Sequence, residues 1–199
     1  MEYQGMQDTN LHIFVMCVYI RGSALICEIY RKNMALSPEQ LCAKLDEMQI
    51  IYQYHEHQPL HTVEDSQKFR GEIEGGHCKN LFLKTKKGQL FLIVVLEDCR
   101  VDLKQLEKIF AVGRISFGKP ELLMEKLGVE PGSVTPFAAL NDLEKEVTVV
   151  LDKSMLEQEK LNYHPLVNTA TVTLGSKDLL RFIVANHKEP MQMHVPQKE

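Results

Sequence analysis

The sequence predicts a single α+β domain, with a mixed and mostly antiparallel sheet flanked by helices. Two observations carry this prediction. Apolar runs of strand length alternate with amphipathic helical segments, but without the regular strand–helix–strand rhythm of a parallel sheet. Two of the runs, 79–85 and 89–96, are joined by Lys86-Lys87-Gly88, which indicates a hairpin. A chain of 199 residues is long enough for one such domain with a core of its own.

Local signals mark the ends of the predicted elements. Ser37 caps the first helix, with Pro38 at its first position and Gln40 three residues after the cap. Further helices are expected over 62–69, 102–110, 120–127 and 176–187. Strands are expected over 50–55, 79–85, 89–96, 115–118, 146–152 and 168–174. The continuous apolar character of 79–85 and 89–96 favours a central place in the sheet, with both faces buried.

Residues 1–33 differ from the rest of the chain. The stretch 11–30 is mostly apolar, but Arg21 and Glu28 interrupt it. A charge near the centre of a membrane span costs roughly 2.5–3.5 kcal/mol, so this stretch is a poor transmembrane helix. We expect an N-terminal extension outside a domain that begins at or near Met34, the alternative being a membrane-associating or targeting segment. The domain is expected to span 34–187, and the polar residues 188–199 are expected to form a flexible tail.

Charge and cysteine content narrow the class of protein. The net charge is −4, which argues against non-specific coating of nucleic acid. Residues 79–119 nevertheless carry nine basic and four acidic side chains, a local excess that suits a partner with few phosphates. The alternative is an ordinary solvated surface. Five cysteines without a CxxC pair indicate a reducing, cytoplasmic compartment.

Few residues offer chemistry by themselves. His55, His57 and His61 resemble a metal site, but Pro59 breaks the element and no further ligand has a matching spacing, so we expect no metal. The sequence also lacks GxSxG, Walker A and GxGxxG patterns. An enzyme built from this chain would therefore depend on positioning and backbone dipoles, and would hydrolyse only a bond that is already activated.

Three segments remain as candidates for a site. Lys79 stands before the apolar run Asn80–Leu83, either as a solvated cation or as the holder of an anion. The loop 132–136 (GSVTP) combines a glycine, which permits close backbone approach, with a stiffening proline. His164 precedes a proline, which favours an extended backbone and lets the ring point into a cleft.

The order of these motifs carries a resemblance. Lys79 in KNLFL, the hairpin KTKKGQLFLIVV, the loop GSVTP and then NYHPLVNTATVTL together resemble the YbaK-type aminoacyl-tRNA editing domains. Within them, the sequence is most similar to the freestanding prolyl-tRNA-synthetase-associated (PrdX or ProX) type. The resemblance covers residues 37–187 and implies a single YbaK-like domain. It also implies a trans-editing reaction, the hydrolysis of alanine wrongly attached to tRNA(Pro), with no cofactor.

Roles for individual residues follow from the resemblance alone. Lys79 matches the lysine that is essential in the family and would hold the phosphate or ribose end of the tRNA. Gly132 and Pro136 match its GxxxP loop, whose N–H groups would bind the ester carbonyl. The remaining substrate-binding residues would be Asn80, His164, Asn168 and Thr62.

The implied partners are the acceptor end of misacylated tRNA(Pro) and, as a further candidate, prolyl-tRNA synthetase, with neither DNA nor a membrane. Contacts to the acceptor stem are expected from five basic residues: Lys84, Lys86, Lys87, Lys177 and Arg181. Two alternatives stay open. The chain could be a non-catalytic module that binds tRNA or a synthetase, or it could deacylate another misacylated tRNA, charged with cysteine or serine.

Overall fold

The computed structural model describes residues 35–59 and 73–198. The expected extension at 1–33, the helix expected over 62–69, and the candidate residues His61 and Thr62 lie outside these ranges. The elements follow in chain order: α3 (Pro38–Glu47), β1 (Tyr52–Glu56), β2 (Gly76–Thr85), β3 (Leu90–Leu96), α5 (Leu103–Ile109), β4 (Ile115–Phe117), α6 (Pro120–Leu127), the 3-10 helix η1 (Pro136–Asn141), β5 (Val147–Asp152), α7 (Lys153–Leu156), β6 (Lys160–Tyr163), β7 (Ala170–Gly175), α8 (Ser176–Asn186) and β8 (Met191–Met193).

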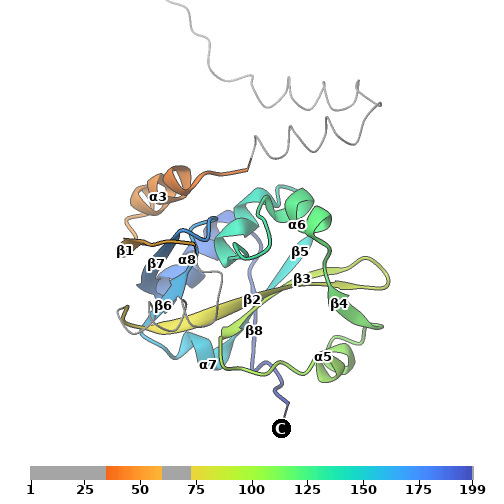
Figure 1. The fold of residues 1–199 in the computed structure, drawn as a ribbon. Helices are drawn as coiled ribbons and strands as arrows, with labels where there is room; N and C mark the ends of the chain where they lie inside the picture. The colour runs from red at the N-terminus through yellow and green to blue at the C-terminus, as the bar shows by residue number, and fades with distance from the viewer. Residues whose placement is uncertain (1–34, 60–72, 199) are drawn as a thin grey trace, which may run out of the picture.

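The strands form one sheet in the order β1–β7–β6–β2–β3–β5–β8, and β4 pairs with β2 outside this path (Figure 1). Four pairings are antiparallel: β1 with β7, β2 with β3, β2 with β4, and β6 with β7. Three are parallel: β2 with β6, β3 with β5, and β5 with β8. The predicted mixed α+β sheet with flanking helices is confirmed.

Strand β3 lies at the centre of the sheet, between β2 and β5. Leu92 and Val94 belong to the core on one face, and Phe91 and Ile93 belong to the core on the other. Both faces of β3 are therefore buried, which explains why its sequence is apolar without alternation. The prediction of a central, two-sided strand is correct here.

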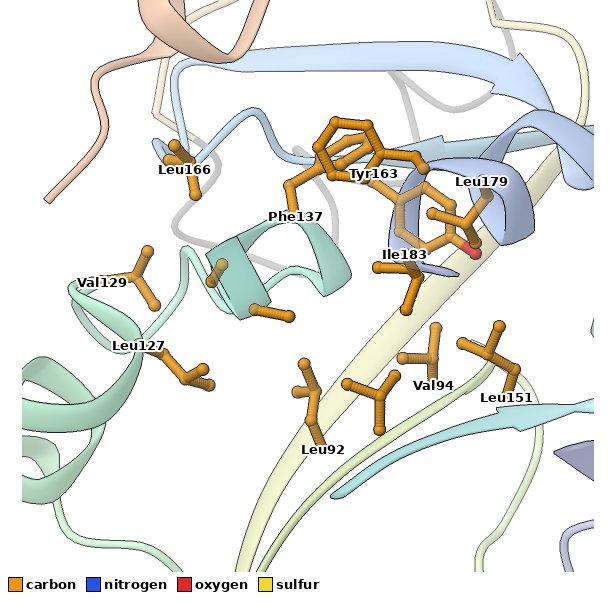
Figure 2. Packing of buried hydrophobic residues seen from close by; sticks show 14 of the residues in the cluster. Leu92, Val94, Leu127, Val129, Phe137, Leu151, Tyr163, Leu166, Leu179 and Ile183 are labelled. Carbon is orange, nitrogen blue, oxygen red and sulfur yellow. The ribbon is translucent and has the colours of Figure 1, made fainter. Parts of the chain in front are cut away.

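The larger core cluster lies on the face that α3, α6, η1 and α8 cover. Phe137, the second residue of η1, is fully buried in this cluster (Figure 2). Its ring packs edge-to-face against Phe182 of α8 at 5.2 Å and against Tyr163 of β6 at 5.9 Å. Burying one such ring contributes roughly 2–3 kcal/mol. This packing fixes the start of η1, and with it the end of the loop 132–136.

The smaller core cluster lies on the opposite face and joins β2, β3 and β5 to α5 through Leu106. The C-terminal segment completes it, because Val195 is 4% exposed and its N–H donates to the Asp152 carboxylate at 2.8 Å. Strand β8 also pairs in parallel with Val150–Asp152 of β5. The expectation of a flexible, unstructured tail at 188–199 is corrected here, because backbone pairing and one buried valine order a segment whose composition is polar.

Local capping follows the sequence signals. Ser37 and Gln40 form the predicted capping box, with the N–H of Ser37 donating to Gln40 at 2.8 Å. Gly128 ends α6 with φ of +64°, a left-handed conformation that favours glycine. Helices η1 and α7 and strand β6 were not predicted, since each is shorter than the periodicity that would reveal it. Within the described ranges, every helix is too short or too polar to cross a membrane.

Candidate active site

The loop 132–136 connects α6 to η1 and adopts a conformation that needs its glycine. Gly132 has φ of +90°, and a Cβ added there would meet nothing closer than Asn168 Nδ2 at 3.9 Å. Backbone conformation, rather than lack of space, therefore requires glycine at this position. The N–H of Ser133 donates to Glu130 at 3.0 Å and closes the turn. Thr135 is fully buried behind it.

Asn80 of β2 contacts this loop directly. Its Nδ2 donates to the backbone oxygen of Val134 at 2.8 Å. The other atom of the amide, Oδ1, is buried and has no hydrogen-bond partner among residues 35–59 and 73–198, and the same is true of Thr135 Oγ1. Buried acceptors without partners are uncommon in folded proteins and commonly indicate a ligand or an ordered water. The unpaired Oδ1 of Asn80 is therefore available to accept a hydrogen bond from a substrate, which fits the predicted substrate-binding role of this residue.

The turn between β6 and β7 carries Asn168 to the loop, and His164 lies at the start of the same turn. Asn168 lies beside Gly132, as the 3.9 Å approach shows. His164 Nδ1 lies 3.0 Å from the backbone oxygen of Ala170, and burial lowers the pKa of its imidazole. A neutral ring that donates from Nδ1 carries its lone pair on Nε2. His57 is its neighbour, with ring centroids 6.2 Å apart.

Lys79 lies elsewhere on the sheet. It is the fourth residue of β2 and pairs with Val95, so the expectation of a strand-end lysine is wrong. Side chains alternate along a strand, and Leu81 and Val95 pack with the smaller core cluster, so Lys79 lies on the face of that cluster. Burial, then Asp152, raises the pKa of the Cys99 thiol on that face, and the charge of Lys79 opposes this. Asn80 and the loop lie on the other face.

A pocket of about 300 Å³ adjoins the loop on the face that carries Asn80. Its apolar lining includes Leu36, Met124 and Leu166, and its polar lining includes Ser133 and Asn168. It lies between α3, α6 and the β6–β7 turn. The pocket therefore touches two segments of the predicted site.

The five basic residues expected to contact tRNA do not form one surface. Lys84, Lys86 and Lys87 are exposed at the β2–β3 hairpin, on the right of Figure 1, whereas α8 carries Lys177 and Arg181 on the left. Arg181 is also engaged within the protein. It donates to the backbone oxygen of Met48 at 3.1 Å and pairs with Asp178 at 3.2 Å. A role for Arg181 in holding the C-terminal end of α3 fits these contacts better than one in binding tRNA.

Candidate nucleophiles and metal ligands are few in this region. Burial raises the pKa of the Cys78 thiol to about 12, which leaves it protonated at neutral pH. His57 Nε2 bonds Thr171 Oγ1 at 3.0 Å. In the part of the chain that the structure describes, no three His, Cys, Asp or Glu side chains are grouped as metal ligands.

Sequence reasoning missed two contributors to the site. Val134 contributes its backbone oxygen. Every residue has such an oxygen, so the residue type at this position gave no signal. His57 was considered only as a metal ligand, and its place beside His164 depends on the pairing of β1 with β7. Thr171, which bonds His57, stands opposite His55 in this pairing. The sequence alone does not show this register of β1 against β7.

Comparisons with known proteins identify the family of the chain. The model of the aminoacyl-tRNA editing domain family matches residues 57–182. Prolyl-tRNA editing protein ProX of Acetoanaerobium sticklandii is 38% identical over 149 residues, which cover 74% of this chain and 91% of that protein. Prolyl-tRNA synthetase associated domain-containing protein 1 of Danio rerio is 34% identical over 163 residues, which cover 79% and 89%.

Solved structures share the fold at lower sequence identity. One described as a "putative trans-editing enzyme for prolyl tRNA synthetase" superposes with a TM-score of 0.63 and 18% identity, covering 83% of this chain and all of the other. A hypothetical protein gives a TM-score of 0.63 and 16% identity over 78% and 97% of the two chains. Fold, motif order and sequence identity coincide over most of the described residues, and the chain belongs to the aminoacyl-tRNA editing domain family.

Proposed function

We propose that this protein removes alanine from mischarged tRNA(Pro) after the tRNA has left its synthetase. The convergence of Asn80, the loop 132–136 and Asn168 on one face of the sheet carries the proposal. Membership of the family makes the chain an aminoacyl-tRNA deacylase. The names of the relatives, which refer to prolyl-tRNA editing, support the choice of tRNA.

The chemistry suits a site without a strong nucleophile. An aminoacyl ester is already labile in water, so the protein needs to orient a water and stabilise the charge that develops on the carbonyl oxygen. Among the hydrogen bonds of the described residues, none uses the backbone N–H of Gly132 or Val134. Each N–H aimed at an oxyanion lowers the activation free energy by roughly 3–4 kcal/mol. We assign this role to the loop, with the free ribose hydroxyl of the substrate assisting the water.

The hydrogen-bonding capacity of Asn80 limits what it binds. One N–H of its Nδ2 is engaged by Val134, the second N–H stays available as a donor, and Oδ1 is an unpaired acceptor. The ribose hydroxyl or the α-ammonium group of the amino acid offers donors and fits. His164 and Asn168 then line the far side of the ester.

Lys79 lies on the face opposite the loop, so a tRNA that reaches both must pass around the edge of β2. Strand β2 pairs with β6 only at residues 76–77 and with β4 only at 83–85, so the described strands leave residues 78–81 without a ladder partner on that edge. We place the last phosphates of the tRNA across this edge. Lys79 would meet them from one face while the ester enters the loop on the other. Lys84, Lys86 and Lys87 continue the positive charge toward the acceptor stem.

Selection of alanine follows from size. A synthetase site built for proline cannot strongly reject a smaller residue, because one missing methylene is worth only about 1–3 kcal/mol. A second site that admits alanine and excludes proline completes the discrimination. This role implies a cytoplasmic protein whose partners are tRNA and, in passing, prolyl-tRNA synthetase.

A panel of charged tRNAs tests the proposal. Purified protein is incubated with alanyl-tRNA(Pro), prolyl-tRNA(Pro), alanyl-tRNA(Ala), and tRNAs mischarged with serine or cysteine, and the remaining ester is measured over time. We expect rapid loss of alanyl-tRNA(Pro) alone. Preference for a seryl or cysteinyl ester would reassign the substrate. Binding of tRNA without hydrolysis of any ester would favour the non-catalytic module.

A further inference from the structure

Asn80 makes one hydrogen bond across the domain, and the geometry of this bond also determines the orientation of the groups that it joins. The bond joins β2 to the loop 132–136, which lies 54 residues away in the chain. Its acceptor is the backbone oxygen of Val134, at 2.8 Å from Nδ2. A carbonyl can only accept, so the amide must present its nitrogen to the loop. The orientation of the Asn80 side chain is therefore fixed by chemistry.

This bond also fixes a peptide plane. The peptide between Val134 and Thr135 is trans, like every other peptide of the described residues. In a trans peptide, the C=O and the following N–H point in opposite directions. Since the oxygen of Val134 points at Asn80, the N–H of Thr135 must point away from β2. Rotation of this peptide by half a turn would exchange a donor for an acceptor at that place.

The donor that results is left without a partner. Thr135 is fully buried, and none of the hydrogen bonds among the described residues uses its N–H. Its hydroxyl oxygen has no partner either. An unpaired N–H inside a protein is rare, because folding normally satisfies it. A group that the fold holds in place and leaves unpaired is suited to a ligand atom that arrives later.

We propose that Asn80 is a positioning residue, which holds the Val134–Thr135 peptide so that the loop offers N–H donors, and not a carbonyl, to the oxyanion of the substrate. This inference rests on the proposed function. It differs from direct substrate binding by Asn80, because the effect passes through the loop. Loss of the bond lowers the rate of the chemical step and leaves binding of the tRNA nearly intact.

Replacement of the amide by a carboxyl provides the test. Asn80→Asp keeps the shape of the side chain, but its ionised form cannot donate to Val134 and repels the carbonyl. At pH 7.5 we expect single-turnover kcat to fall by about 100-fold or more, as for loss of an oxyanion donor, with KM within about 3-fold. The protonated carboxyl regains an O–H donor. The ratio of wild-type to variant kcat should therefore shrink as the pH falls below about 6, because burial raises the pKa of a carboxyl.

Asn186→Asp is the matched control. Asn186 Nδ2 also donates to a backbone oxygen at 2.8 Å, that of Phe182, within α8 and away from the loop. The control should keep its kcat and show no comparable pH-dependent ratio. A variant Asn80→Asp that raised KM and kept kcat would assign Asn80 to substrate binding. A ratio independent of pH would also overturn the proposal.

A second measurement does not depend on catalysis. In an isotope-labelled sample, a through-bond coupling between the side-chain nitrogen of Asn80 and the carbonyl carbon of Val134 reports the hydrogen bond itself. Asn80→Asp should abolish this signal and shift the amide resonance of Thr135, and Asn186→Asp should leave both unchanged. An unshifted Thr135 amide would show that Asn80 does not hold the peptide. This result stands even if the wild-type protein hydrolyses none of the charged tRNAs, which would refute the proposed function alone.

Discussion

Lys79 and Asn80 are neighbours in sequence, yet they leave β2 on opposite faces of the sheet. Asn80 reaches Val134 in the loop, whereas Lys79 lies with Val95 and Cys99. Two adjacent polar residues inside β2 thus serve two different surfaces. The site must extend around the edge of β2 if both take part in the reaction.

Lys79→Ala should abolish deacylation and leave the fold intact. The side chain is only half-buried and has no ion pair among the described residues, so its loss should change the free energy of unfolding by about 1 kcal/mol or less. Single-turnover hydrolysis and a thermal melt measure the two effects. Lys84→Ala, on the same strand but exposed, is the matched control and should weaken tRNA binding only slightly. A folded Lys79→Ala protein with normal hydrolysis would remove Lys79 from the mechanism.

Gly132→Ala should lower activity through the backbone. The added Cβ would meet only Asn168 Nδ2, at an ordinary 3.9 Å, beyond its own chain neighbours, but φ of +90° strains any residue other than glycine by roughly 1–3 kcal/mol. The loop should relax and misalign its donors, which would reduce kcat at nearly constant KM. Gly132→Pro should be more severe, since proline cannot adopt this φ and also lacks the N–H. Gly88→Ala, also at φ of +90° but in the hairpin turn, should cost similar stability without this loss of kcat.

Asp142→Asn should destabilise the protein at neutral pH and much less in acid. The Asp142 carboxylate accepts hydrogen bonds from His187 at 3.2 Å and from the N–H of Val147 at 2.7 Å. Burial opposes ionisation of Asp142, but bonds from His187 and backbone N–H groups outweigh it and lower the pKa. A lowered folded-state pKa contributes stability above the unfolded value of about 3.9, and this contribution is lost as the pH falls through the folded value.

Urea titrations of wild type and Asp142→Asn at pH 7 and pH 3 measure this linkage. The difference in unfolding free energy should be about 3 kcal/mol or more at pH 7 and smaller at pH 3. Glu144→Gln alters an exposed carboxylate nearby and should have almost no effect at either pH. A difference that does not change between the two pH values would contradict the lowered pKa.

Hydrolysis should survive exhaustive chelation and depend on the ribose of the substrate. The mechanism uses loop donors and a water, and a terminal adenosine that lacks the hydroxyl beside the ester should be cleaved far more slowly. Both rates can be measured with the same mischarged tRNA. Activity lost on chelation and restored by zinc would overturn the proposed mechanism. Unchanged cleavage of the deoxy substrate would remove only the ribose-assisted step.

Deletion of residues 1–33 should change neither folding nor activity. The described domain is anchored just after this point, where the N–H of Leu36 donates to Asn141 at 3.0 Å. Melting temperature and deacylation rate of the 34–199 fragment are compared with those of the whole chain. Precipitation of the fragment, or loss of a cellular location that the whole chain has, would show that the extension is functional.

Sequence patterns predicted the elements that bury a regular apolar face. Ser37, Gly128 and the turn at Lys86–Gly88 marked helix and hairpin ends correctly, because capping and turn chemistry are local. Strand β8 was missed since its stability comes from backbone pairing with β5 and from the single side chain of Val195. Non-local contacts of this kind leave no periodicity in the sequence.

The candidate site was predicted in part for the same reason. The motifs located the loop, Asn80 and the β6–β7 turn, and the structure brings these together. Placement of Lys79 failed, because it depends on where β2 begins: a strand start at Gly76 puts Lys79 inside the strand. The contact of Arg181 with the end of α3 was not predicted, because a basic residue on an exposed helix gives no sign that it bonds a neighbouring helix.

Strand β8 has a consequence for the solubility of the protein. It pairs with Val150–Asp152 at the end of β5, a strand whose sequence VTVVL from Val147 to Leu151 is uncharged, lacks proline and favours strands strongly. An uncovered edge of this composition is a template for pairing with other chains and for amyloid-like association. Proteolytic trimming after Lys188 would remove this cover. We therefore expect the C-terminal segment to reduce aggregation. A protein that has lost it should form oligomers before it loses its secondary structure.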